Sequence, residues 1–160
     1  MNSSNLFVKF SYAQGGGSYP DKPITIVVPY PPGGFNDTLG RIVGKKLSDA
    51  WGVTVIVDNK PGAGTTIGTN FVARAAPDGY TILVAQFPFA ANPFIYKSLP
   101  YDSNKAFAPI VLAGRAPMVL VVNENSKIKT LADLLSSARK DPGKINYGSS
   151  GSGSSEHLAM

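Results

Sequence analysis

Two glycine-rich segments contain the residues whose types and spacing are best suited to chemistry. The first, residues 31–37 (PPGGFND), follows the apolar run 24–28, and the second, residues 147–155 (YGSSGSGSS), includes the end of another β-type run. Glycine allows a backbone N–H to approach an anion closely, and the start of a following helix adds about half a positive charge. Serine hydroxyls supply further hydrogen-bond donors. We therefore expect a small anionic molecule to be held between two lobes by backbone N–H groups and hydroxyls.

Composition and motifs disfavour other kinds of site. The chain has no cysteine and one histidine, His157, so neither a thiolate nucleophile nor a cysteine or histidine metal site is expected. The serines lack the G-x-S-x-G nucleophile elbow, and no G-x-x-x-x-G-K-[ST] nucleotide loop occurs. The glycines at 62, 64 and 68 do not have G-x-G-x-x-G spacing. We predict no catalytic residue, no metal and no cofactor.

The candidate residues also have structural interpretations. A carboxylate at Asp37 would repel a phosphate, and helix capping is its favoured role. The serine-rich segment has the composition of a solvated linker, although the β-type run before it and the apolar residues after it count against that. A second functional hypothesis is a small α/β hydrolase or transferase that acts on an anionic substrate. Its general base would be Asp37, Glu156 or His157.

The net charge of +5 fits an anion-binding protein better than a nucleic-acid-binding one. The isoelectric point is near 9.5, but the basic residues are scattered, and like-charge runs are no longer than the pairs Lys45-Lys46 and Arg139-Lys140. The sequence has no basic stripe interleaved with aromatic residues, so no nucleic-acid partner is expected. It also has no run of eighteen apolar residues, so no membrane-spanning segment is expected.

The first eighteen residues are interpreted as a leader. An apolar patch at residues 6–10 precedes Ser11 and Ala13, which resemble the small-residue end of a secretory signal. The thirteen residues up to Ala13 are too few for a complete signal. A degenerate export signal and a disordered leader are therefore both open, followed by a glycine-rich stretch at 14–18.

From residue 23 onward, strand patterns alternate with helix patterns. Strands are predicted at 24–28, 53–57 and 80–85, and further short strands at 109–113, 118–122 and 145–147. This order predicts an open α/β sheet with right-handed crossovers. Ligands of such sheets bind beyond the carboxyl ends of the strands, which is where both glycine-rich segments lie.

Helices are predicted from their end signals and their apolar spacing. The first helix is expected to be capped by Asn36 or Asp37 and to end at Gly52. Its inner face is expected to consist of Leu39, Ile42, Val43 and Leu47. A second helix is expected from Thr65 or Thr66, a short one within 92–101, and another after the capping box formed by Thr130 and Asp133.

Several motifs in one order resemble the substrate-binding proteins of tripartite tricarboxylate transporters, also called the Bordetella uptake gene family. The motifs are 19–24 (YPDKPI), 31–34 (PPGG) with Asp37, 58–64 (DNKPGAG), 76–81 (APDGYT), 92–93 (NP), 99–102 (LPYD) and 147–158 (YGSSGSGSSEHL). Together they cover about residues 19 to 160. Several motifs in order are far more specific than a single glycine pattern.

The resemblance implies an α/β fold of the periplasmic-binding-protein type II, or Venus flytrap, class, with parallel-rich sheets in two lobes. Members of that family are about twice as long as this chain, so the similarity is to their N-terminal part and the second lobe is truncated. The implied division is a leader at 1–18, a first lobe at 19–116 and the start of an incomplete second lobe at 117–160.

The resemblance further implies a periplasmic receptor that is not an enzyme. It would capture a small carboxylate, such as a dicarboxylate, a tricarboxylate or an acidic amino acid, and deliver it to the membrane permease subunits of the transporter. We expect a monomer without a cofactor. The implied ligand contacts are Gly33, Gly34, Phe35, Asn36, Asp37, Gln86, Phe87, Ser149, Ser150, Gly151, Gly153, Ser154 and His157.

Overall fold

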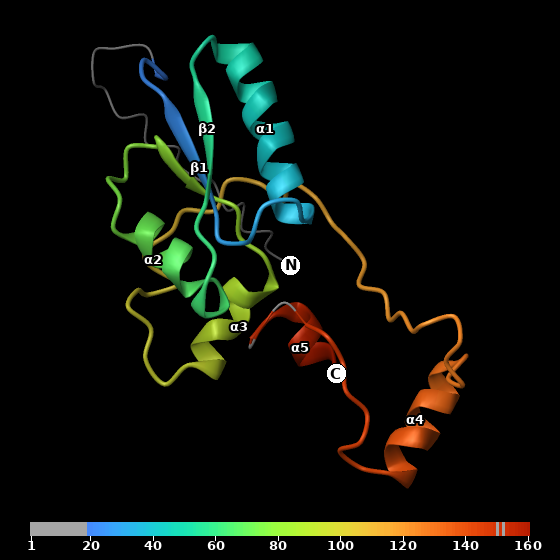
Figure 1. Ribbon diagram of the computed structural model, residues 1–160. Coiled ribbons are helices and arrows are strands. Elements are labelled where there is room, and N and C mark those ends of the chain that lie inside the picture. The colour runs from blue at the N-terminus through green and yellow to red at the C-terminus, as the bar shows by residue number, and fades with distance from the viewer. Residues whose placement is uncertain (1–18, 150, 152) are drawn as a thin grey trace, which may run out of the picture.

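The centre of the protein is a three-stranded parallel sheet (Figure 1). The computed structural model describes residues 19–149, 151 and 153–160. Strand β1 (Ile24–Val28) lies between β2 (Val55–Asn59) and β3 (Thr81–Leu83), and its register with β2 runs from Ile24 opposite Val55 to Val28 opposite Asn59. Four of the five β1 side chains are at most 1% exposed, because a central parallel strand is covered on both faces. The predicted strand 24–28 is confirmed, whereas β2 begins two residues later than predicted and β3 is shorter.

Two helices cover the two faces of this sheet. Helix α1 (Phe35–Trp51) contacts β1 and β2, and helix α2 (Thr66–Ala73), which follows a 3-10 turn at Ala63–Thr65, contacts β1 and β3. The chain moves from β1 to β2 on one side and then returns past β1 to β3. Right-handed crossovers in these opposite directions place α1 and α2 on opposite faces. The predicted α/β class with a parallel sheet is confirmed.

Small residues, rather than the predicted apolar ones, form the centre of the face by which α1 packs on the sheet. A Cβ at Gly40 would lie 2.9 Å from Val28 Cγ2, and one at Gly44 would lie 3.3 Å from Val55 Cγ1. Ile42, predicted on the inner face, is 56% exposed, and the other three predicted residues are only half-buried. The prediction was wrong for Ile42, because the close approach of helix and sheet selects glycine at the centre of this face and leaves the larger residues beside it.

The ends of α1 confirm one prediction and correct another. Gly52 ends the helix in the left-handed conformation (φ 68°), as predicted. The N-cap is Gly34, with no side-chain cap bond, so the capping prediction for Asn36 or Asp37 was wrong. Asp37 instead lies in the first turn and accepts the N–H of Gly33, which precedes the cap.

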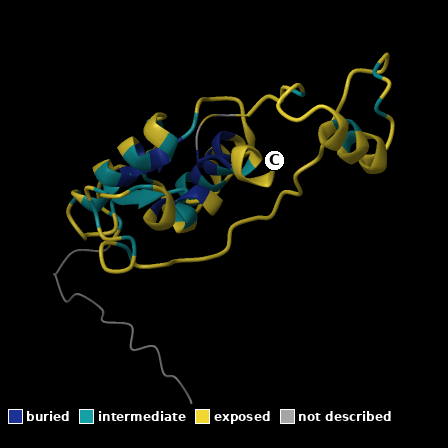
Figure 2. Ribbon diagram, turned by 90° about the horizontal axis from the view of Figure 1, so that it is seen from below, coloured by how far each residue is buried: buried dark blue, intermediate teal, exposed yellow. Residues whose placement is uncertain are grey.

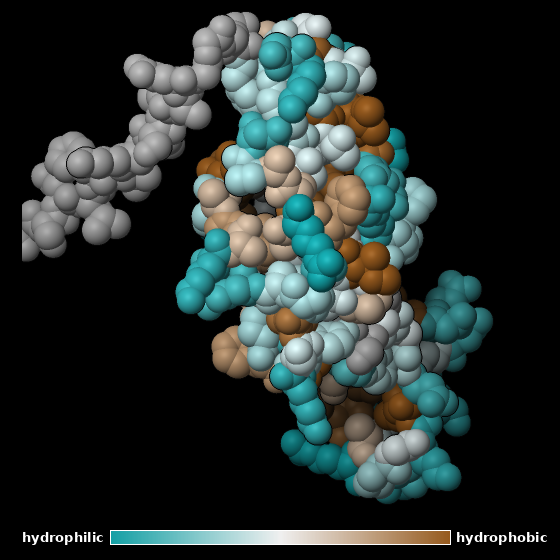
Figure 3. All heavy atoms as spheres, turned by 90° about the vertical axis from the view of Figure 1, so that its left-hand side faces the viewer, coloured by the Kyte–Doolittle hydropathy of each residue, from teal (hydrophilic) through white to brown (hydrophobic). Residues whose placement is uncertain are grey.

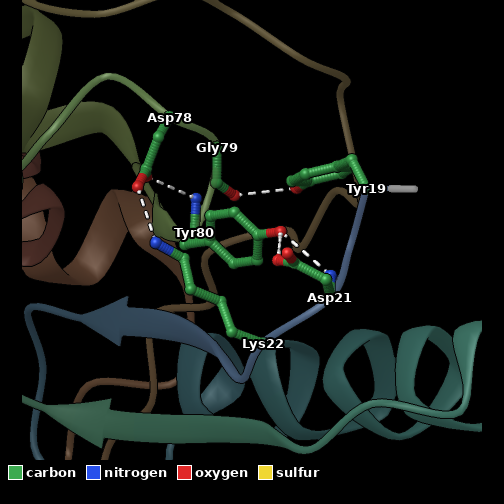
Figure 4. Close-up of polar contacts among 6 residues, drawn as sticks. All are labelled: Tyr19, Asp21, Lys22, Asp78, Gly79 and Tyr80. Carbon is green, nitrogen blue, oxygen red and sulfur yellow. Dashed lines mark hydrogen bonds and ion pairs between the residues drawn. The ribbon is translucent and has the colours of Figure 1, made fainter. Parts of the chain in front are cut away.

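The entry to β1 is joined to the loop before β3 by a polar and aromatic cluster (Figure 4). Tyr80 Oη donates to Asp21 Oδ1 at 2.5 Å and accepts the Asp21 N–H at 3.0 Å. Lys22 Nζ lies 3.1 Å from Asp78 Oδ2 and 4.2 Å from the centre of the Tyr80 ring. This cluster is at the amino end of the sheet, opposite the end at which the glycine-rich segment follows β1.

After β3, helix α3 (Phe87–Ile95) begins five residues earlier than the predicted short helix, and the chain then leaves the sheet. No strand is assigned to residues 109–113, 118–122 or 145–147 within the described parts of the chain, so these three predictions were wrong. Val111 and Val121 are 77% and 78% exposed. A strand requires a neighbour that completes its hydrogen bonds, and apolar periodicity does not show whether one is present.

The last elements are α4 (Leu131–Lys140) and α5 (Ser155–Ala159). Thr130 and Asp133 form the predicted capping box at the start of α4, which has no buried residue and lies away from the sheet. Figure 2 shows buried residues concentrated in the sheet and its helices, and exposed residues along the connection to α4. Hydrophobic side chains also reach the surface on the face shown in Figure 3. None of the described helices is long and apolar enough to cross a membrane.

Candidate ligand-binding site

The candidate site lies at the carboxyl end of β1 and β3, where the strand order β2-β1-β3 reverses. The loop after β1 leads to α1, and the loop after β3 leads to α3. In an open parallel sheet, this reversal opens a crevice beyond the strand ends, and it is the usual place for a ligand. Here Asn36 Nδ2 donates to Gln86 Oε1 at 3.2 Å and joins the first turn of α1 to the loop after β3. The structure thus brings together two residues that are 50 positions apart in the sequence.

The glycines of the first segment face open space. A Cβ built on Gly33 or Gly34 meets no atom within 4 Å. Gly33 has a φ of +91°, a conformation that side chains rarely adopt, whereas Gly34 has an ordinary φ of −84°. The N–H of Gly33 donates to Asp37 Oδ2 at 2.8 Å. The two glycines therefore differ in backbone conformation, although both face open space.

Asp37 lies at the centre of a hydrogen-bonded network and is only 4% exposed. Its Oδ2 accepts bonds from the N–H of Gly33 and from Arg41 Nε at 3.1 Å. Its Oδ1 lies 2.9 Å from Arg41 Nη2 and accepts a bond from Asn59 Nδ2 at 3.0 Å. The Arg41 bond, followed by the Gly33 bond, lowers the pKa of Asp37 to about 2. Both carboxylate oxygens thus have protein partners that keep the group ionised.

The second segment is folded around its own polar groups. Ser154, which is 7% exposed, caps α5 by accepting the His157 N–H at 3.2 Å. The N–H of Gly153 donates to His157 Nδ1 at 3.3 Å, and the N–H of Gly151 donates to Ser149 Oγ at 3.4 Å. The predicted residue Ser150 lies outside the described residues. His157 therefore shapes the segment through its backbone and its ring nitrogen.

This second segment packs on α3, close to the first. A Cβ at Gly153 would lie 3.7 Å from Asn92 Oδ1 and 3.8 Å from Ile95 Cδ1. Figure 1 shows α5 beside α3. The structure therefore places residues 31–37 and the described residue Gly153 of the second segment at the same end of the sheet, together with Gln86 at the start of α3.

Two predicted contacts are exposed aromatic side chains. Phe35 is 44% exposed at the start of α1, and Phe87 is 55% exposed at the start of α3. Phe35 directly follows Gly34, and Phe87 directly follows Gln86. Both rings are accessible at the starts of these two helices.

Asn92, Thr65 and Tyr30 were not predicted as site residues, and the structure places all three at this end of the sheet. Asn92 is fully buried, and its Nδ2 donates to the Gly64 carbonyl at 2.9 Å. This bond holds a turn in which Thr65 adopts a φ of 78°, a strained conformation for a β-branched residue. The Asn-Pro pair at 92–93 was the sequence signal for Asn92. No pattern in the sequence distinguished Tyr30.

The described residues contain no group of three or more histidine, cysteine, aspartate or glutamate side chains that could hold a metal ion. Besides the paired Asp37 and Arg41 and the ring of His157, the polar groups of the two segments are amides, hydroxyls and backbone N–H groups. Such an arrangement can bind and orient an anion. The acidic side chain with the largest number of protein contacts here, Asp37, is already paired with Arg41.

Residues 39–160 match the sequence model of the tripartite tricarboxylate transporter family receptor. The chain belongs to this receptor family. It is 44% identical over 147 residues to the UPF0065 protein in the tcbD-tcbE intergenic region of Pseudomonas sp. (strain P51), an alignment that covers 92% of this chain and 44% of that protein. The resemblance inferred from the motifs is thus confirmed, and the chain spans less than half the length of this relative.

Solved structures of receptors agree with this assignment. R. palustris Rpa4515 with adipate matches with a TM-score of 0.79 and 34% identity, over 85% of this chain and 46% of that one. The periplasmic binding protein BugD matches with a TM-score of 0.69 and 35% identity, over 88% and 47%. MatC (Rpa3494) from Rhodopseudomonas palustris with bound malate matches with a TM-score of 0.67 and 30% identity, over 76% and 42%. The predicted periplasmic-binding-protein fold class is confirmed.

Proposed function

We propose that this receptor-family chain captures a small dicarboxylate at the carboxyl end of β1 and β3. The observation that carries the proposal is the Asn36–Gln86 bond, which ties the first turn of α1 to the loop after β3 where the strand order reverses. Adipate and malate, the acids named with two of the solved relatives, are both dicarboxylates. They support a small carboxylate as the class of ligand.

The proposed contacts come from three segments. Gly34 supplies a backbone N–H beside open space, and Gln86 supplies a side-chain amide. Ser149 and Ser150 supply hydroxyls from the second segment. Gly33 and Asp37 contribute by shaping the first loop, because they are hydrogen-bonded to each other. Phe35 and Phe87 would cover the hydrocarbon part of the acid.

The role of the whole protein follows the same proposal. The ligand would be held between a first lobe at 19–116 and a second lobe that begins at 117, and closure would bring the lobes together. The protein would act as a monomer in the periplasm and would deliver the acid to the membrane subunits of a tripartite transporter. The match to that receptor family and to a periplasmic binding protein supports this role.

The alternative of a small hydrolase or transferase is not supported. The matched family is a receptor family and BugD is a binding protein, not an enzyme. Among the three candidate bases, Asp37 is held by Arg41, and His157 Nδ1 accepts a backbone N–H. These two side chains therefore shape the site instead of facing a substrate as free bases.

Thermal unfolding with and without millimolar acids tests the proposal first. The panel comprises adipate, malate, succinate, citrate, glutamate, aspartate and nicotinate. A ligand at a hundredfold excess over its Kd adds about 2.7 kcal/mol to the free energy of unfolding. We expect a rise in the melting temperature with a dicarboxylate and none with nicotinamide, which lacks the carboxylate. No rise with any acid would contradict the proposal.

A Gly34→Val variant then tests the location of the site by isothermal titration. Valine fits the extended backbone of Gly34 and meets no protein atom, so its side chain would occupy the space proposed for the ligand. We expect at least a tenfold loss of affinity. Ser136→Val is the matched control, because Ser136 is exposed on α4 and α4 lies away from the two segments. Equal affinity in both variants would refute the location.

A further inference from the structure

The hydroxyl of Tyr30 is a buried polar group at the candidate site with no hydrogen-bond partner among the described residues. Tyr30 lies two residues after β1, and its backbone carbonyl accepts a bond from Asn59 Nδ2 at 3.1 Å. Asn59 is also bonded to Asp37. The main chain of Tyr30 is therefore fixed by the same network that shapes the first glycine-rich segment.

Buried polar groups in native proteins nearly always have a partner, so an unpaired hydroxyl points to a missing acceptor or donor. Burial, and secondarily the charge of Glu156, raise the pKa of Tyr30. The phenol therefore keeps its proton at neutral pH and can donate. Glu156, whose charge contributes to this shift, is in α5, the helix that follows the second segment.

The position of Tyr30 distinguishes it from the other buried tyrosine hydroxyl without a partner in the described chain. Tyr101 Oη also lacks a partner, but the Tyr101 ring packs edge-on against Phe107, with ring centres 6.0 Å apart. Tyr101 and Phe107 follow α3 in the chain and adjoin neither glycine-rich segment. Tyr30 lies in the loop that leaves the carboxyl end of β1, directly before the first glycine-rich segment.

From this placement we infer that Tyr30 is a ligand-binding residue whose hydroxyl donates a hydrogen bond to a carboxylate oxygen of the bound acid. The inference rests on the proposed function and adds to it a contact that a phenylalanine could not make. In the free protein the hydroxyl contributes little to stability, since it has no protein partner. Its contribution is made when the ligand is bound.

Tyr30→Phe tests the inference by titration of the purified protein with adipate, malate and succinate. We expect affinity to fall by about 10- to 100-fold, the range for one hydrogen bond to a charged group. The melting temperature without ligand should stay the same or rise, because a buried unpaired hydroxyl has been removed. Tyr101→Phe is the matched control and should bind as tightly as the unchanged protein.

The other outcomes show which of the two, the inference or the proposed function, is wrong. If Tyr30→Phe binds as tightly as Tyr101→Phe, the inference fails while the proposed function stands. If Tyr30→Phe melts at a lower temperature with unchanged affinity, the hydroxyl is a structural group bonded within the protein, and the inference again fails. If the unchanged protein binds none of the three acids, the proposed function fails and the inference fails with it.

Discussion

Asn59 donates a hydrogen bond from Nδ2 to Asp37 Oδ1 at 3.0 Å and so ties the last residue of β2 to the first turn of α1. The same amide group donates to the Tyr30 carbonyl at 3.1 Å. The Asn59 oxygen accepts a bond from Arg41 Nη2 at 3.1 Å. One side chain therefore holds the loop after β1, the start of α1 and the arginine that pairs with Asp37.

We expect Asn59→Ala to lower the free energy of unfolding by about 1–3 kcal/mol, because it leaves three partners without their bonds. Urea unfolding measures the change. Asn104→Ala is the matched control, since Asn104 is exposed and its hydrogen bond to Asp102 is made by its backbone N–H. An equal effect of both substitutions would show that the Asn59 bonds contribute nothing.

The pKa of Asp37 predicts how stability changes in acid. The folded-state value, about 2, lies below the ordinary value of 3.8, so the stabilisation is fully present above pH about 4 and is lost as the pH falls toward 2. We expect the urea midpoint to fall over this range and to fall less in Asp37→Asn, which cannot take up the proton. Asn104→Ala keeps Asp37 and should show the full decline. An identical decline in Asp37→Asn would contradict the assignment.

Gly68→Ala should destabilise the protein although alanine is the better helix former. A Cβ at this position would lie 2.8 Å from the Lys60 carbonyl oxygen and 2.8 Å from Pro29 Cβ. Neither neighbour can move freely, so we expect a loss of about 1–3 kcal/mol that outweighs the gain of about 1 kcal/mol in helix propensity. Denaturant unfolding measures it. Gly148→Ala, which meets no atom within 4 Å, should be neutral.

Tyr80→Phe should lower the free energy of unfolding by about 1 kcal/mol, because it removes the two bonds between Tyr80 Oη and Asp21 (Figure 4). The ring contact with Lys22 is kept. Thermal unfolding measures the change. Tyr101→Phe removes a hydroxyl without a described partner and should cost nothing. If both variants lose the same amount, the Asp21 bonds do not stabilise the entry to β1.

The order of the strands and helices up to α3, and the start of α4, were predictable because each has a local cause. The apolar run 24–28 has the unbroken apolar pattern of a strand covered on both faces. Gly52 ends α1 because glycine adopts the left-handed conformation without strain, and Thr130 with Asp133 caps α4 through neighbouring groups. The motifs that indicated the receptor family are likewise stretches of sequence, and the family comparison confirmed them.

Features that depend on distant partners were not predictable. Whether 109–113 and 118–122 form strands depends on a neighbouring strand, which the local pattern cannot supply. The inner face of α1 depends on how closely the helix approaches the sheet, and this approach favours Gly40 and Gly44 over larger residues.

The sequence by itself determined the family, the class of fold and the two segments to be considered as a ligand site. Only the tertiary structure decided what each residue in and around them does. Asp37 is occupied by Arg41 and Asn59, Asn36 reaches Gln86 across the reversal in strand order, and Tyr30 has a buried hydroxyl without a described partner. The physical reason is that a side chain's chemistry follows from its type, whereas its partners and burial follow from the packing of distant elements.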